Sequence, residues 1–256
     1  MLGHWPTHSL AQGTIPSPAT AAPANQSSAS PLTQKRSAFE AMSPALQAMQ
    51  TDDAQNPAFL WVQGARASFE AQCSRCHSPQ SLQDVATRYP AFDAILRRPL
   101  TVAGRINQCR RRHLNQPALG PEDDELLGLQ TLLGLAARGQ PMQSVADPRL
   151  QPWLARGQAL WQQRHGQIDL SCAECHDRHA GGRLAGSPIP QGHATGYPTY
   201  RLEWQTLGSL QRRFRNCMTG VRAEPYAQHS DEFTALELYL RQRAAGMAVE
   251  TPAVRP

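Results

Sequence analysis

Two stretches of the chain decide its fold: "CSRCH" at residues 73–77 and "CAECH" at residues 172–176. Both have the form C-x-x-C-H, in which two thiols become thioethers to the vinyl groups of a haem and the adjacent His binds the iron. A zinc knuckle or a redox-active C-x-x-C is the alternative for a single motif. Because the motif occurs twice and His follows at once each time, the sequence predicts two covalently bound haem c groups. The predicted attachment residues are Cys73, Cys76, Cys172 and Cys175, and the predicted iron ligands are His77 and His176.

The sequence downstream of the two motifs is also duplicated. "YPAF" begins at Tyr89 and "YPTY" at Tyr197, and each stands equally far before a further cysteine, Cys109 or Cys217. An arginine precedes each of these cysteines by one helical turn, and an apolar, helix-forming stretch follows. The copies are about 100 residues apart, which indicates an internal repeat. The second copy has a longer, Gly- and Pro-rich loop at residues 181–196.

The repeat predicts a mainly α-helical fold of two tandem cytochrome-c-like haem domains with long loops. We expect the first domain over residues 37–145 and the second over residues 146–256. In each domain one helix should precede the haem motif, a second should carry the lone cysteine, and a third should close the domain. The closing helices are expected over residues 124–139 and 231–246, because each stretch begins at an Asp and ends at a Gly. Residues 1–36 are rich in Pro, Ala and Ser, and we expect a disordered lead-in there.

The composition and charge bear on which partners the protein can have. The 256 residues carry a net charge of +5, and of the 25 Lys and Arg residues only Lys35 is a lysine. Arginine suits the recognition of oxyanions, although an Arg-rich composition also follows from a GC-rich genome. No nucleic-acid-binding motif accompanies the charge, so nucleic acid is not an expected partner. No run of about 18 apolar residues occurs, so no membrane span is expected.

The haem motifs also predict the cellular location. Bacteria attach haem c outside the cytoplasm, so we expect a periplasmic protein. Residues 1–36 lack the apolar core of a signal peptide. We therefore expect that an export signal has been removed, replaced or lost upstream of Met1.

Cys109 and Cys217 are the candidates for the sixth ligand of each iron. Each lies on a stripe at helical spacing and should face its haem; the stripe of Cys217 comprises Leu207, Leu210, Phe214 and Val221. Many c-type cytochromes supply a Met instead, and the available methionines are Met142, Met218 and Met247. Only the cysteines, however, repeat between the halves. A Cys109–Cys217 disulfide and inert buried thiols stay open as alternatives, as does a second His ligand from His179 or His193.

Arginines surround Cys217 in the sequence. Arg213 lies one helical turn before Cys217 and nearly on the same helix face, whereas Arg215 points the other way. Nearby positive charge favours the thiolate form of a cysteine. Arg213 is therefore predicted to stabilise a thiolate and to bind an anion that approaches it; an ion pair with a haem propionate is the alternative. Arg105 stands in the same relation to Cys109.

Several segments resemble the SoxA family, the c-type cytochrome subunits of the bacterial thiosulfate-oxidising Sox system. The similar segments are "NPAFLWVQG", "VATRYPAFD", "GRINQCR", "LSCAECHD", "IPQGHATGYPTYRLEWQTLGSLQRRFRNCMTGVRAEPY" and "ALELYLRQRAAGM", and the second half is the more specific. They run from about Asn56 to the end. Some members of the family have lost the first haem. Because Cys73, Cys76 and His77 are present here, the resemblance implies the dihaem form.

The resemblance also implies partners and site residues. It implies a heterodimer with a small monohaem cytochrome, SoxX. That pair would join thiosulfate oxidatively to a cysteine of the carrier protein SoxY, which is bound to SoxZ; the activity is that of an L-cysteine S-thiosulfotransferase. Each haem would take His and Cys ligands. Cys217 would be the active-site residue, able to carry a persulfide sulfur, and Arg213 would bind the substrate.

The residue chemistry is consistent with this hypothesis. Joining thiosulfate to a thiol releases two electrons, which a haem beside the reacting sulfur can accept. An Arg beside a thiolate lowers the repulsion between it and an incoming dianion. A plain dihaem electron-transfer cytochrome is the alternative, but it leaves the duplicated Arg-x-x-x-Cys unexplained. A haem-based sensor is a third possibility, and the role of the first haem stays open between storage, structural support and relay.

Overall fold

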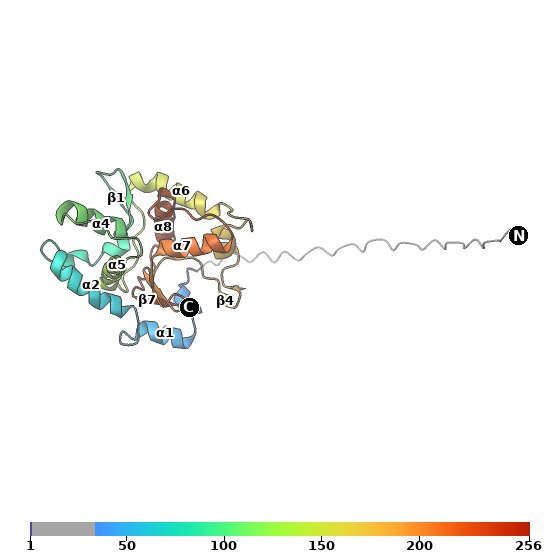
Figure 1. Ribbon diagram of the computed structural model, residues 1–256, viewed down its shortest axis with the longest axis horizontal. Helices are drawn as coiled ribbons and strands as arrows, with labels where there is room; N and C mark the ends of the chain where they lie inside the picture. Colours follow the sequence, from blue (N-terminus) through green and yellow to red (C-terminus); the bar gives the residue numbers. More distant parts are fainter. Residues whose placement is uncertain (2–33) are drawn as a thin grey trace.

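The computed structural model describes residue 1 and residues 34–256, so the predicted lead-in lies almost entirely outside the described residues. The described chain forms two similar helical halves that lie side by side (Figure 1). None of the helices in this part of the chain has the length and apolarity that a membrane crossing needs.

The first half follows the predicted order of helices. An N-terminal segment carries η1 (Ala38–Ala41) and α1 (Pro44–Thr51). Helix α2 (Phe59–Gln72) leads directly into the first haem motif, and the short helices η2 (Pro79–Leu82) and α3 (Val85–Arg88) follow it. Strands β1 (Ala91–Asp93) and β2 (Arg98–Leu100) form an antiparallel hairpin. Helix α4 (Val102–His113) carries Cys109, and α5 (Asp124–Ala136) closes the half.

The second half repeats this order with additions. Helices η3 (Pro148–Leu150) and α6 (Gln151–Gln162) precede the second haem motif, which runs into a π-helical turn, η4 (Glu174–Arg178). The longer loop forms a small hairpin of β3 (Arg183–Leu184) and β4 (Ser187–Pro188). Strands β5 (Thr199–Arg201) and β6 (Thr206–Gly208) correspond to β1 and β2. Helices α7 (Leu210–Gly220) and α8 (Asp231–Arg243) correspond to α4 and α5, and β7 (Ala253–Arg255) ends the chain.

Local sequence explains where the equivalent helices begin. The Thr101 hydroxyl accepts the backbone N–H of Gly104 at 3.0 Å, and the Ser209 hydroxyl accepts that of Arg212 at 3.0 Å. These are N-caps, which satisfy a backbone donor that the helix itself leaves free. The caps start both cysteine-bearing helices at the same point of the repeat, so Cys109 and Cys217 occupy equivalent positions.

The structure corrects three details of the predicted helices. Leu207 lies on β6 and Val221 follows the end of α7, so the stripe on the helix of Cys217 is shorter than predicted. The closing helices end at Ala136 and Arg243, before the predicted glycines. Gly139 and Gly246 each have a φ of 83°, a left-handed backbone that favours glycine and turns the chain away from the helix.

A symmetric set of backbone hydrogen bonds joins the halves just after those turns. Pro141 and Ala248 form an antiparallel bridge. The N–H groups of Gly139 and Gly246 donate to the carbonyls of Val249 and Met142 at 2.9 and 2.8 Å. Likewise, Met142 N–H donates to Met247 and Val249 N–H to Gln140, at 2.8 and 2.9 Å. Each bond has a counterpart at the equivalent residue of the other half, so this ladder relates the halves by a local two-fold symmetry.

Close helix packing forms the core of each half. Helix α6 packs on α8 and α2 on α5. On α8, Phe233 and Leu236 are buried against Leu160 and Trp161 of α6. A Cβ at Gly157 would lie 2.1 Å from the carbonyl oxygen of Ala235, so only glycine allows α6 to approach α8 this closely.

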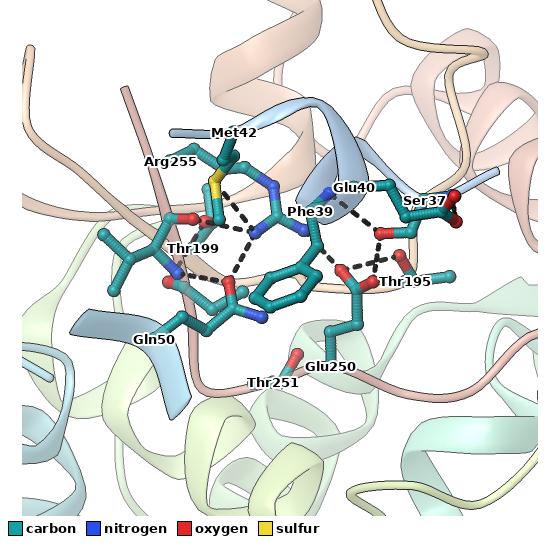
Figure 2. Close-up of polar contacts among 12 residues, drawn as sticks. Ser37, Phe39, Glu40, Met42, Gln50, Thr195, Thr199, Glu250, Thr251 and Arg255 are labelled. Carbon is teal, nitrogen blue, oxygen red and sulfur yellow. Dashed lines mark hydrogen bonds and ion pairs between the residues drawn. The ribbon is translucent and has the colours of Figure 1, made fainter. Parts of the chain in front are cut away.

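The two ends of the described chain meet beside the second half. Strand β7 pairs in parallel with β5. Figure 2 shows Glu250 facing Ser37 and Thr195, with which it forms hydrogen bonds, while the Arg255 guanidinium donates to Gln50 at 2.5 Å. The N-terminal segment therefore anchors β7, and β7 in turn supports β5.

Candidate functional site

The second haem motif and the second lone cysteine come together in one site. His176 lies in η4, and its Nδ1 hydrogen-bonds the carbonyl oxygen of Pro190 at 2.7 Å, so Nε2 is the ring nitrogen that is directed toward Cys217. Burial raises the pKa of Cys217, but a hydrogen bond with His176 and the charges of Arg213 and Arg201 outweigh that effect and lower it overall. The thiolate of Cys217 is therefore favoured next to His176.

The two attachment cysteines of this motif face the same sulfur. Burial and the proximity of Cys217 raise the pKa of Cys172 to about 12 and also raise the pKa of Cys175. The structure thus brings together every predicted residue of the second haem site: Cys172, Cys175, His176 and Cys217.

Close contacts with Trp161 and Gly192 hold the His176 ring in position. The indole N–H of Trp161 donates to Asp177 at 2.7 Å, and the Trp161 ring lies 5.6 Å from the His176 ring. Gly192 has a φ of 71°, and a Cβ there would lie 2.7 Å from Trp161 and 3.3 Å from His176. Arg243 stacks over Trp161 at 4.5 Å and donates to Asp177 at 2.6 Å. A side chain at residue 192 would displace either ring.

The arginines near Cys217 do not behave alike. Arg213 is partly buried, influences the pKa of Cys217, and makes no ion pair within the described part of the chain. Arg215 is exposed and donates at 3.5 Å to the carbonyl of Tyr226. Arg212 stacks over Trp204 at 4.3 Å. Arg213 is thus the one arginine of α7 placed toward the sulfur.

The first half assembles its site less completely. Burial and the proximity of Cys109 raise the pKa of Cys73, so Cys109 faces this motif as Cys217 faces the other. His77 and Cys76, however, are exposed. Arg105 is engaged by Asp93 at 3.0 Å and by the Tyr89 hydroxyl at 3.1 Å.

The structure gives other contacts to Met142, Met218, Met247 and His193. All six cysteines are free, so Cys109 and Cys217 form no disulfide. Met218 is buried in the α6–α8 core, and Met142 and Met247 belong to a cluster at the joint between the halves. The His193 Nε2 is within hydrogen-bond distance of Gln191 at 3.0 Å, and burial lowers the pKa of His193 to about 4.

The residues of the second site fit a haem c. Two thiols lie near a His whose Nδ1 is held by a backbone carbonyl and near a cysteine whose thiolate is favoured. His and thiolate are both known axial ligands of haem iron. Within residues 34–256, no group of three or more His, Cys, Asp or Glu is arranged to hold a metal ion alone.

Sequence reasoning missed Arg201, which ends β5 and influences both Cys217 and Arg213. It also missed the roles of Trp161 and Pro190 in holding His176. Arg201 could have been found, because it stands as far after Tyr197 as Asp93 stands after Tyr89. Trp161 and Pro190 have no comparable signal, since only the folded chain brings them to His176.

Comparison with known proteins extends these observations. The SoxA/TsdA cytochrome c domain family matches residues 58–142 and 156–249, one match in each half. The chain is 33% identical to the L-cysteine S-thiosulfotransferase subunit SoxA of Pseudaminobacter salicylatoxidans, over 80% of this chain and 76% of the relative. It is 31% identical to the same subunit of Rhodovulum sulfidophilum, over 82% and 76%.

A solved structure agrees with this result. A chain in the crystal structure of SoxXA from P. pantotrophus superposes with a TM-score of 0.83, covers 87% of both chains and is 28% identical. The match confirms the predicted mainly α-helical cytochrome c fold with haem c as its cofactor type. On the family match and these identities, the chain belongs to the SoxA group of the SoxA/TsdA cytochrome c domain family.

Proposed function

We propose that this chain acts as the SoxA subunit of an L-cysteine S-thiosulfotransferase, which joins thiosulfate oxidatively to a cysteine of a SoxY-like carrier held by a SoxZ-like protein. One observation carries the proposal: the thiolate-favouring Cys217 lies beside His176 and beside Arg213, an arginine that makes no ion pair in the described part of the chain. A plain electron-transfer site has no need of that unpaired cation. The names of the curated relatives support the same activity.

The reaction needs an anion to be held beside a sulfur. Thiosulfate and the carrier thiolate form one S–S bond and release two electrons. Arg213 binds the sulfonate group and offsets the repulsion between two anions. Cys217 is the active-site thiolate, kept ionised by the neighbouring arginines and by His176. Cys172 and Cys175 would attach the haem, His176 and Cys217 would hold its iron, and the group would supply a site that accepts electrons.

The first half supports a different role for its haem. Cys73 and Cys76 would attach it, and His77 and Cys109 would bind its iron. Arg105 is neutralised by Asp93, so it does not offer a free charge to an incoming dianion. We propose that the haem of the first half serves electron transfer or structural support. We also propose that the boundary between the two domains lies between residues 145 and 146. A chain matured in the periplasm should have the mass of the polypeptide plus two haems; a mass with one haem or none would contradict the dihaem form.

We further propose a periplasmic heterodimer with a SoxX-like monohaem cytochrome c. The partner in the SoxXA structure and the haem-attachment motifs support this assembly. The decisive experiment measures thiosulfate-dependent reduction of cytochrome c by the heterodimer, with and without the reduced carrier. Activity that depends on both thiosulfate and the carrier is expected. Rapid haem reduction and reoxidation without any conjugated carrier would indicate an electron-transfer protein instead.

A further inference from the structure

The two halves differ in the charge of one equivalent residue beside the cysteine. Strands β1 and β5 both follow a Tyr-Pro pair and both pair with the next strand as a hairpin. Their last residues are Asp93 and Arg201, at the same distance after Tyr89 and Tyr197. The first half thus has an acidic residue at the position where the second half has a basic one.

In the first half, Asp93 neutralises Arg105. The Asp93 side chain is only 4% exposed, and its Oδ2 lies 3.0 Å from the guanidinium of Arg105. Gln108 donates to Asp93 at 3.2 Å, and the backbone N–H groups of Ile95 and Leu96 donate to it at 3.0 and 2.7 Å. These bonds lower the pKa of Asp93, against its burial, so it is a carboxylate that neutralises Arg105.

In the second half the corresponding residue adds a second cation. The Arg201 side chain is 14% exposed, and its charge acts on Cys217, Tyr197 and Arg213. Its only ion pair in the described chain is to Glu203 at 2.9 Å, and the Glu203 side chain is 58% exposed. Arg213 makes none. The hairpins have the same register and Asp93 contacts Arg105, so the equivalent position of Arg201 lies toward Arg213 and the partly buried Cys217. In the described chain neither arginine pairs with a buried carboxylate.

Arg201 is held rigidly in this position. Its Nε donates to the carbonyl oxygen of Pro256 at 2.8 Å, and its guanidinium lies 5.0 Å from the Trp204 ring. The next residue, Leu202, donates its N–H to Arg255 on β7 at 2.9 Å. A preorganised cation of this kind binds an anion without first giving up side-chain freedom.

We propose that Arg201 is a second substrate-binding residue, which together with Arg213 binds the sulfonate of a thiosulfate-class dianion beside Cys217. In the first half, Asp93 prevents the binding of such an anion. The proposal rests on the proposed function, since it names how that site selects its substrate. A partly buried pair of like charges is unfavourable until an anion joins it, and a dianion matches two guanidinium groups. A haem propionate carries the same anionic chemistry, so the test must separate the two.

The test uses the haem-loaded heterodimer and compares Arg201→Gln with Arg215→Gln, a matched control that removes one exposed positive charge from the same half. We expect kcat/KM for thiosulfate to fall about 10- to 100-fold in Arg201→Gln and less than about 2-fold in Arg215→Gln. Arg201→Lys should recover part of the loss, because the charge stays while the planar fork is lost. Haem content and the electron paramagnetic resonance spectrum of the second haem should stay as in the wild type.

A binding measurement separates this proposal from the proposed function. Thiosulfate binding is followed by calorimetry in the oxidised heterodimer without carrier, with sulfate as a competing anion that cannot react. Weaker binding in Arg201→Gln supports the proposal, even if the wild type does not conjugate thiosulfate. Unchanged binding and unchanged kcat/KM overturn it while the proposed function stands. A loss of haem, or an altered spectrum of the second haem, would make Arg201 a propionate anchor and also overturn it.

Discussion

A half-buried carboxyl group between the halves should make the stability of the protein depend on pH. Glu237 lies on α8 and lines a cavity bordered by Tyr89, Tyr197 and Gln211. Burial raises the pKa of Glu237 to about 7, and the Gln211 amide, which donates to it at 3.1 Å, offsets only part of this shift. The folded protein therefore keeps the proton of Glu237 at pH values where the unfolded chain has released it.

The sign and size of the effect follow from proton linkage. Well below the ordinary glutamate pKa of 4.5 both states are protonated, and Glu237 does not affect the free energy of unfolding. As the pH rises from 4.5 to about 7, the unfolded state alone ionises, so stability falls. The full shift corresponds to about 3 kcal/mol, and because the side chain keeps some exposure we expect roughly 1–3 kcal/mol.

The substitution Glu237→Gln removes this dependence, because glutamine has the shape of the protonated acid. Denaturant unfolding of the holoprotein at pH 5, 6, 7 and 8 gives the difference between variant and wild type. We expect the advantage of the variant to be smallest at pH 5, to grow up to about pH 7 and to level off by pH 8. Glu70→Gln, at an exposed position on α2, should show no such trend. A difference that stays flat with pH, or a variant less stable than wild type at pH 8, would refute the reasoning.

Three further predictions concern the second haem site. Cys217→Ala should abolish thiosulfate conjugation while the chain still folds and holds haem, whereas Cys109→Ala should keep substantial activity in the same assay; equal losses would point to a shared electron-relay role. Arg213→Leu should lower kcat/KM about 10- to 100-fold and Arg213→Lys should recover part of it, as steady-state kinetics would show, whereas loss of haem instead would identify a propionate anchor. Gly192→Ala should reduce haem incorporation, because its Cβ would lie 2.7 Å from Trp161 and 3.3 Å from His176. Gly181→Ala is the control, with a φ of 86° and nothing within 4 Å, and an equal haem-to-protein ratio in both variants would rule out crowding as the cause.

Much of the fold could be predicted because its signals are local and occur twice. The C-x-x-C-H motifs, the repeated cysteines and the apolar periodicity of residues 124–139 and 231–246 each indicate a helix or a ligand without reference to distant residues. The hairpins were missed because their strands are only 3 residues long, too short for an alternating pattern to stand out. Leu207 was assigned to a helix because its spacing fits, although pairing with Tyr200 places it on β6.

The candidate site was only partly predictable for a related reason. Helical spacing was enough to place Arg213 beside Cys217, since one turn of helix separates them. The neutralisation of Arg105 by Asp93 depends on a hairpin that folds back onto α4, and no periodicity reveals such a contact. The contrast between Asp93 and Arg201 was nevertheless readable by aligning the two copies from their Tyr-Pro pairs.

The hydrogen-bond ladder between residues 139–142 and 246–249 has a consequence for the origin of the fold. Its bonds are exchanged between equivalent residues, so the surface that each half offers is self-complementary. A single ancestral half can pair with a second copy of itself through the same bonds, as an isologous homodimer. Gene duplication would then fuse the two subunits while keeping their interface. Once fused, the copies no longer share one sequence, and one can carry Asp where the other carries Arg.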